Sequence, residues 1–203
     1  EDHISHFNTL LPAFKDDRYI KINGKPLFTI YKALEFTDIE NFIKLWQKLA
    51  QENGFPGIYF IAQNPFNNTQ EQVNKLLALG FDAINTIGLW DARKANVSIF
   101  VRIRARITSI ITGLPFARKY EDIYSKFISD IDSNENVYPT LIPNWDHTPR
   151  SGTAGYVLLD STPNLFRKHI KQVFEVIKNK KTDNQIIFLK SWNEWGEGNY
   201  MEP

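Results

Sequence analysis

Hydrophobic positions in the first half of the chain alternate between the spacing of strands and the spacing of helices. Short runs rich in β-branched and aromatic residues predict strands at residues 27–31, 58–62 and 82–86. Apolar residues three and four positions apart predict helices over residues 37–54 and 69–80, between these strands. This order of strand, helix and strand favours a parallel sheet with right-handed crossovers.

Polar residues support the predicted helix boundaries. Thr37 with Glu40, and Thr69 with Gln72, have the three-residue spacing of a capping box, in which each side chain satisfies a free backbone N–H. A glycine ends each of these two helices. A further helix is predicted over residues 3–15, ahead of a small hairpin that leads into the first strand.

The alternation breaks down between residues 87 and 118. Residues 101–107 alternate apolar residues with arginines, a pattern that suits either an exposed strand or part of a helix, and both stay open. In a barrel this region would be an excursion from the rim, with its arginines on a solvated face. Regular elements then return: helices are predicted over 120–131 and 163–179, and extended segments at 137–143, 156–159 and 186–189.

The composition of the chain mainly excludes classes of protein and of partner. The chain has 203 residues, a net charge of +1 and 42% hydrophobic residues, which suits one globular domain over residues 1–203. The balanced charge gives no reason to expect a nucleic acid or an anionic membrane as the main partner. No apolar run reaches the roughly 18 residues that span a bilayer, and the first residues do not form a signal peptide, so a cytoplasmic location is expected. The sequence leaves the oligomeric state open.

The last residues carry the strongest chemical signal. Glu194 and Glu197 follow a predicted buried strand and are flanked by two tryptophans and two glycines. Glycosyl transfer and hydrolysis need two carboxyl groups about 5 to 10 Å apart, on opposite sides of the reacting carbon. An apolar indole wall would raise a carboxyl pKa, and glycines would let the backbone turn so that both glutamates face one pocket. The pair is therefore a candidate for glycosidic chemistry.

Three segments resemble a known family. The run Trp192-Asn193-Glu194-Trp195-Gly196-Glu197-Gly198, followed by Met201-Glu202-Pro203, resembles a signature shared by WbsX-type lipopolysaccharide (O-antigen) biosynthesis proteins and family 99 glycoside hydrolases. The segments Phe14-Lys-Asp-Asp-Arg-Tyr-Ile-Lys-Ile-Asn-Gly-Lys-Pro-Leu-Phe28 and Pro143-Asn-Trp-Asp-His-Thr-Pro-Arg150 resemble the WbsX pattern. Together the three segments extend over nearly the whole chain.

The resemblance implies an α/β fold, a TIM-like (β/α)8 barrel of the kind found in family 99. Such a barrel usually needs about 250 residues, so we expect an incomplete one with five or six β/α units, the C-terminal portion of a longer domain. The family implies that Glu194 is the base that assists attack by the substrate's own 2-hydroxyl. It implies that Glu197 is the general acid and base.

Other candidates for substrate binding follow strand ends, where barrel active sites are assembled. They are Trp145, Asp146, His147 and Arg150 after one strand, Asn193, Trp192, Trp195 and Glu202 in the motif, and Tyr31, Gln63 and Asn64 after earlier strands. No cofactor is expected. No metal is expected either, because the chain has no cysteine and no His-x-x-x-His pair.

Three functions remain open at this point. The first is a glycosidase acting on a bacterial surface oligosaccharide or polysaccharide through Glu194 and Glu197. The second is a glycosyltransferase of O-antigen or capsule assembly, for which Arg150 could bind a donor phosphate. The third is a glycan-binding module without catalysis, since one fold hosts many functions.

Overall fold

A computed structural model describes residues 2–64, 68–94 and 98–202 of the chain. Its main sheet has the order β1 (Lys21–Ile22), β2 (Lys25–Tyr31), β3 (Tyr59–Asn64), β4 (Ala83–Thr86) and β6 (Val137–Tyr138). β1 pairs with β2 in the antiparallel sense, and all the other neighbours are parallel. The predicted parallel sheet is therefore confirmed.

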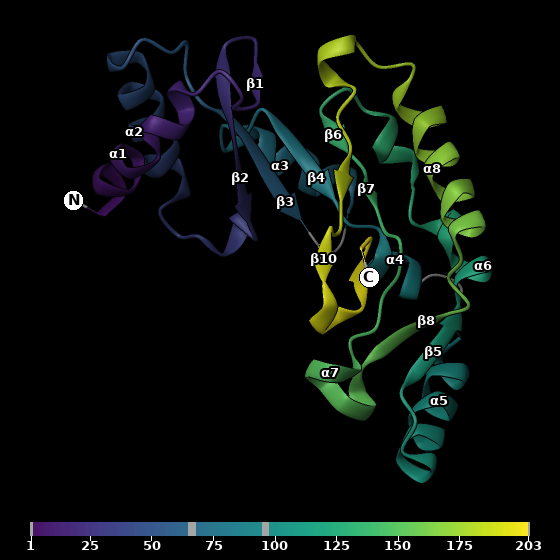
Figure 1. Cartoon of the computed structure of the whole chain (residues 1–203). Coiled ribbons are helices and arrows are strands. Elements are labelled where there is room, and N and C mark those ends of the chain that lie inside the picture. Colours follow the sequence, from purple (N-terminus) through teal and green to yellow (C-terminus); the bar gives the residue numbers. More distant parts are fainter. Residues whose placement is uncertain (1, 65–67, 95–97, 203) are drawn as a thin grey trace.

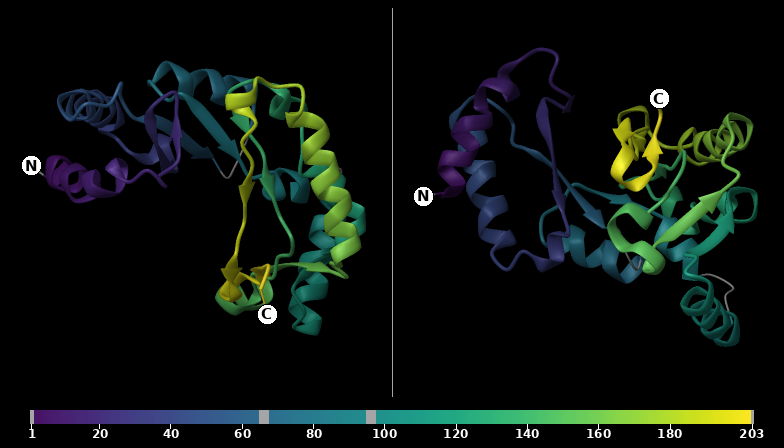
Figure 2. Two further views of the ribbon diagram at one scale, coloured as in Figure 1. Left: turned by 45° about the horizontal axis from the view of Figure 1, so that its top comes forward. Right: turned by 60° about the horizontal axis from the view of Figure 1, so that its bottom comes forward.

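The sheet continues beyond β6 after one interruption. Pro139 separates β6 from β7 (Thr140–Leu141), and β7 pairs in parallel with β9 (Phe188–Leu189). Proline has no N–H to donate to a ladder, but its carbonyl accepts from the Phe188 N–H at 3.0 Å. The strands of the arc, namely β2, β3, β4, β6 with β7, and β9, thus follow one another in chain order and curl into an open arc, seen from two further sides in Figure 2. The fold is a mixed α/β half-barrel, and the described residues do not close it into a complete barrel.

Helices cover the outer side of the arc (Figure 1). α1 (Asp2–Lys15), α2 (Ile39–Glu52) and α3 (Gln70–Ala78) accompany the first strands, and α8 (Pro163–Ile177) packs beside β7. Thr69 and Thr162 cap α3 and α8 by accepting from backbone N–H groups. The capping box expected at Thr37 is wrong: α2 begins after Asp38, whose carboxylate binds the Asn41 amide instead.

The core of the arc is aromatic. Trp46 of α2 is fully buried, and its ring lies 4.6 Å from Phe42 and 4.7 Å from Phe28 between ring centres. Its indole N–H donates to the His3 carbonyl at 3.0 Å, so α1 and α2 are joined by a hydrogen bond as well as by packing. The periodic residues that predicted α2 are the ones that contact the sheet.

The irregular region after β4 is an excursion, as expected. It contains α4 (Leu89–Lys94), α5 (Ile99–Thr112) and β5 (Phe116–Lys119), and β5 pairs in parallel with β8 (Tyr156–Leu159) apart from the main sheet. Of the two alternatives for residues 101–107, the helix is correct. Ser98 caps α5, and Gly113, in the left-handed conformation with φ +67°, ends it.

The helix predicted over residues 120–131 is wrong in its extent. It divides into α6 (Tyr120–Ile123) and the 3₁₀ turns η2 (Tyr124–Lys126) and η3 (Asp130–Ser133). Two long-range contacts explain the division. The Tyr120 hydroxyl donates to the Ile142 carbonyl at 2.6 Å, and the buried Asp132 carboxylate accepts from the Thr86 hydroxyl at 2.5 Å. Asp132 also accepts from Ser129, which caps η3.

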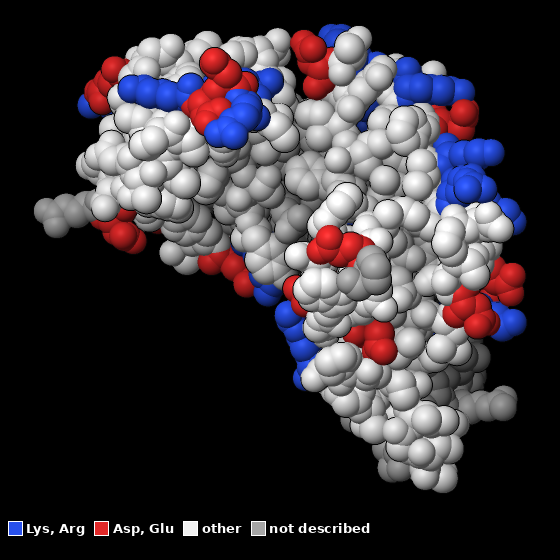
Figure 3. All heavy atoms as spheres, in the orientation of Figure 1, with Lys and Arg blue, Asp and Glu red and all other residues white. Residues whose placement is uncertain are grey.

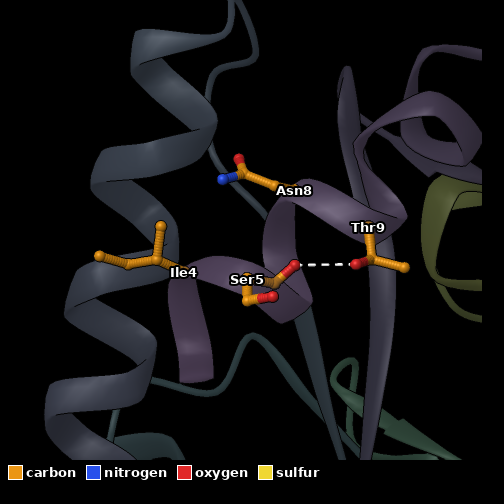
Figure 4. Close-up of a pocket in the computed structure, with 4 residues that line it drawn as sticks. All are labelled: Ile4, Ser5, Asn8 and Thr9. Atoms are coloured by element: carbon orange, nitrogen blue, oxygen red, sulfur yellow. Dashed lines mark hydrogen bonds between the residues drawn. The ribbon is translucent and has the colours of Figure 1, made fainter. Parts of the chain in front are cut away.

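Two surface features have no direct bearing on the candidate site. Within the described residues, no helix is long and apolar enough to cross a membrane. A shallow hollow on α1 is lined by Ile4, Ser5, Asn8 and Thr9, and the Thr9 hydroxyl donates to the Ser5 carbonyl at 2.9 Å (Figure 4). None of these four side chains is titratable, so the hollow offers no acid or base.

Candidate functional site

Two loops meet at the carboxyl ends of β7 and β9 (Figure 1). The first leads through residues 142–147 to α7 (Thr148–Ser151). The second contains β10 (Asn193–Glu194), the 3₁₀ turn η6 (Trp195–Glu197) and β11 (Asn199–Tyr200). The Asp146 N–H donates to the Glu197 carbonyl at 2.7 Å, so the backbones of the two loops are joined directly.

The second loop is a tight hairpin. β10 and β11 pair in the antiparallel sense, with Glu194 opposite Asn199. The Ser191 hydroxyl accepts from the Glu194 N–H at 3.0 Å and donates to the Asn199 carbonyl at 3.1 Å. Gly198 has φ +58°, and a Cβ at this position would lie 2.7 Å from the Cβ of Asp146. Glycine therefore serves both the turn and the close approach of the two loops.

Glu197 is the most enclosed charge of the site. Its side chain is only 12% exposed, and three nitrogen-bearing side chains face its carboxylate. Arg150 Nη1 lies 3.1 Å and His147 Nε2 3.8 Å from Oε1, and Lys190 Nζ lies 3.5 Å from Oε2. The surroundings of Glu197 are therefore cationic and not the indole wall that the motif suggested.

Glu194 reaches the same guanidinium from the other side. Its Oε1 lies 3.4 Å from Arg150 Nη2, and its side chain is 37% exposed. A Cβ on Gly196 would come within 3.0 Å of this oxygen, so the glycine leaves room for the carboxylate. Arg150 therefore contacts both glutamate carboxylates, one through each terminal nitrogen.

An aromatic layer lies behind the charges. Trp145 is 2% exposed and stacks on the His147 ring at 5.9 Å, while the edge of Trp90 meets it at 5.5 Å. Lys190 Nζ lies 5.3 Å above the Trp145 ring, in cation–π geometry. The Trp145 N–H is buried without a hydrogen-bond acceptor among the described residues.

The position of His147 is set by its neighbours. The Ser151 hydroxyl lies 3.0 Å from His147 Nδ1, which leaves Nε2 facing Glu197. The backbone N–H of His147 donates to the Tyr156 carbonyl at 3.1 Å, and the adjacent Leu158 N–H donates to the Trp145 carbonyl at 2.8 Å. β8 therefore holds Trp145 and His147 in place, although sequence reasoning assigned it no such part.

Several other candidates have different surroundings. Asp146 accepts from the N–H and the hydroxyl of Thr148 and so stabilises its own turn. Trp192 and Trp195 are 62% and 54% exposed, and Glu202 accepts from the Trp192 indole N–H at 3.1 Å. Asn193 is exposed in β10.

The candidates on the first strands lie on the other half of the arc. Tyr31 ends β2 and is 59% exposed, with Lys32 Nζ 5.9 Å from its ring. Gln63 donates to the Asn85 side chain at 2.8 Å and thus links β3 to β4. The side chain of Asn64 lies outside what the structure describes. The described contacts do not join Tyr31 or Gln63 to the glutamate pair.

Sequence reasoning missed three contributors: Lys190, Trp90 and Ser151. Lys190 directly follows β9, and Trp90 follows the carboxyl end of β4, so both are at the strand ends where site residues were sought. Their positions after strand ends could have identified Lys190 and Trp90 as candidates. Ser151 has no such signal, because only the turn of α7 brings it to His147.

Metal-ligating side chains are not grouped in the described part of the chain. No three His, Cys, Asp or Glu side chains are grouped there in a way that could hold an ion. The nitrogens around Glu197 are those of Arg150, Lys190 and His147, and cationic neighbours oppose the binding of another cation.

Comparison with known families now decides the chain's affiliation. The family described as "Glycosyltransferase WbsX" matches residues 1–203. The chain belongs to this family. Curated relatives of the chain include two proteins described as "Uncharacterized protein WxcX", both from Xanthomonas campestris pv. campestris, and each is 21% identical to the chain. The alignments include the whole chain but only 28% of each relative.

Solved structures support the fold of this WbsX-family chain. One, described as "Glycoside hydrolase-like protein", has a TM-score of 0.58 and 17% identity. Another is the GH99 endo-alpha-mannosidase from Bacteriodes thetaiotaomicron, with a TM-score of 0.57 and 16% identity. The match covers 98% of the chain but 53% and 54% of the two structures. The chain thus corresponds to about half of a GH99-like fold.

Proposed function

We propose that the chain is a portion of the single catalytic domain of a carbohydrate-active enzyme. This enzyme acts on a glycosidic bond of a bacterial surface polysaccharide. The observation that supports this is the convergence of Glu194 and Glu197 on Arg150, at the carboxyl ends of β7 and β9. The GH99 likeness in fold and the family of the chain agree with carbohydrate chemistry. The buried indole of Trp145 packs behind the charges, against His147 and Lys190.

In this proposal the two glutamates have separate roles. Glu194, the more exposed one, removes the proton from the substrate's 2-hydroxyl, whose oxygen then attacks the anomeric carbon. Glu197 gives a proton to the leaving glycosidic oxygen as the carbon–oxygen bond breaks. Glu197 then takes a proton from the water or hydroxyl acceptor that reopens the intermediate, and Glu194 returns its proton. Each carboxyl thereby regains its starting state.

Arg150 has a positioning role in this reaction. Its two terminal nitrogens hold one glutamate each, which sets the distance between the acid and the base. Protonation of Glu197 weakens its attraction to Arg150 and Lys190. The acid role therefore requires Glu197 to take up its proton against these two contacts.

A glycosyltransferase is the second candidate, favoured by the description of the family. Here the leaving group is the phosphate of an activated sugar donor. Arg150 and Lys190 are the cations of the site that could bind this phosphate. Both are engaged with Glu197. The Asp-x-Asp sequence at residues 130–132 gives this candidate no metal site, because Asp132 is buried and bound to Thr86 and Ser129.

The test compares hydrolysis and transfer with matched variants. The protein is assayed on mannose-containing oligosaccharides, aryl α-mannosides and activated sugar donors, together with Glu194→Gln and Glu197→Gln. We expect both variants to lose about a thousandfold in kcat or more, with an unchanged far-UV circular dichroism spectrum. Glu175→Gln, on the exposed side of α8, is the control and should keep full activity.

The outcomes separate the three functions. Hydrolysis that depends on both glutamates supports the glycosidase. Consumption of an activated donor without hydrolysis establishes the transferase and requires new roles for the glutamates. Glycan affinity that survives both substitutions, with no turnover by the unaltered protein, would identify a binding module and contradict the proposal.

A further inference from the structure

Helix α5 presents large apolar side chains to solvent. Phe100 and Ile111 are 79% and 77% exposed, and Ile103 and Ile107 are about half exposed. Leu114, directly after the Gly113 cap, is 64% exposed. A single exposed apolar residue needs no explanation, but four along one helix, with a fifth directly after it, form a patch that does.

The spacing of these residues places them on one stripe. At about 100° per residue, Phe100, Ile103, Ile107 and Ile111 fall within one narrow sector of the helix. The equivalent stripes of α2 and α8 face the core, where Trp46 and Val173 are fully buried. The stripe of α5 has no such cover among the described residues. Figure 1 shows α5 projecting at the end of the molecule, next to α7.

The fold holds α5 in this exposed position. The Ser109 hydroxyl donates to the Thr153 carbonyl at 3.1 Å, and α5 also contacts β5 and the 3₁₀ turn η4 (Gly152–Ala154). η4 directly follows α7, which carries Arg150. The apolar stripe is therefore connected to the candidate site through one short turn.

Charge in this region is strongly one-sided. Between residues 92 and 119 lie seven of the chain's 24 lysines and arginines and none of its 23 acidic residues. Three of the seven, Arg102, Arg104 and Arg106, belong to α5. At the tip of the molecule formed by α5, the described atoms in view carry no acidic group (Figure 3). An anionic surface would complement this segment.

We propose that α5 docks the protein onto an anionic lipid bilayer, with its apolar stripe in the boundary between headgroups and acyl chains. An apolar stripe on a cationic helix too short to span a bilayer is typical of interfacial binding. A second copy of the chain fits less well, because it would bring two cationic segments face to face. Docking through α5 would hold the neighbouring site close to the lipid surface.

Sedimentation with vesicles tests this proposal independently of any activity. The protein is mixed with vesicles of phosphatidylcholine alone and of phosphatidylcholine with phosphatidylglycerol in equal parts. We expect binding to the anionic vesicles only, with release at ~1 M salt, where the screening length falls to ~3 Å. Replacing Arg102, Arg104 and Arg106 by glutamine should lower the partition coefficient about a hundredfold.

A matched pair of variants separates the stripe from general surface effects. Ile107→Asp combined with Ile111→Asp should abolish sedimentation while leaving the circular dichroism spectrum unchanged, because both side chains are exposed. Phe174→Asp, an exposed apolar residue on α8, should bind like the unaltered protein. Equal binding to neutral vesicles, no binding at all, or loss of binding in Phe174→Asp would each overturn the proposal. A dimer that Ile111→Asp dissolves would overturn it in favour of a second copy.

Discussion

The core around Trp46 and the loop pair around Glu197 are stabilised by opposite means. Trp46 is fully buried among aromatic rings from α2 and the sheet, so its contribution comes from apolar packing. Glu197 is held by charged side chains and by the backbone bond from Asp146. Packing of the first kind supports the whole fold, whereas contacts of the second kind fix the geometry of a few atoms. Substitutions in the two regions should therefore affect different measurements.

The largest effect is expected from Trp46→Ala. Removing a fully buried indole leaves a cavity and removes the hydrogen bond to the His3 carbonyl, which together should cost about 4 kcal/mol of unfolding free energy. Urea denaturation followed by circular dichroism measures this loss. Trp192→Ala is the matched control, and because Trp192 is 62% exposed we expect a change below about 1 kcal/mol. Equal losses in both variants would refute the contrast between core and loop.

A smaller effect is expected from Gly198→Ala, at the junction of the two loops. The left-handed backbone disfavours a side chain, and the new methyl group would meet the Asp146 Cβ at 2.7 Å. We expect a loss of about 2 kcal/mol in unfolding free energy, with reduced kcat/KM because the Glu197 backbone moves.

Gly113→Ala separates the two causes of that loss. Gly113 has a similar φ of +67° and no atom within 4 Å of an added Cβ, so it measures the strain alone. If Gly113→Ala and Gly198→Ala lose equal stability and neither loses activity, then the contact with Asp146 does not shape the site.

Local patterns predicted most of the elements in the arc. α2, α3 and α8 follow the apolar spacing, and Thr69 caps its helix as its position suggests. The errors arise where a distant contact overrides the local preference. The Tyr120 hydroxyl and the Asp132 carboxylate bind residues of other segments and divide what the pattern alone presents as one helix.

The sequence predicted where the candidate site lies better than it predicted which side chains contact one another there. Glu194, Glu197, His147 and Arg150 were expected near strand ends, and the structure brings these four together. The cationic surroundings of Glu197 could not be foreseen, because Lys190 and Arg150 arrive from different loops. The sequence also did not predict that Trp192 and Trp195 are exposed, since residue type alone favoured an apolar indole wall around the glutamates.

The smallest effect is expected from Arg150→Lys. This variant separates activity from stability most directly in the loop pair around Glu197. The substitution keeps the charge, but a single ammonium cannot hold Glu194 and Glu197 on two nitrogens at once. We expect kcat/KM to fall about tenfold, corresponding to ~1.4 kcal/mol of transition-state stabilisation. The unfolding free energy should stay within about 0.5 kcal/mol, because the Arg150 side chain is 55% exposed. Arg18→Lys, at an exposed pair with Asp16, is the control and should change neither quantity. A stability loss in Arg150→Lys with full activity would instead make this arginine a structural residue and remove the positioning role from the mechanism.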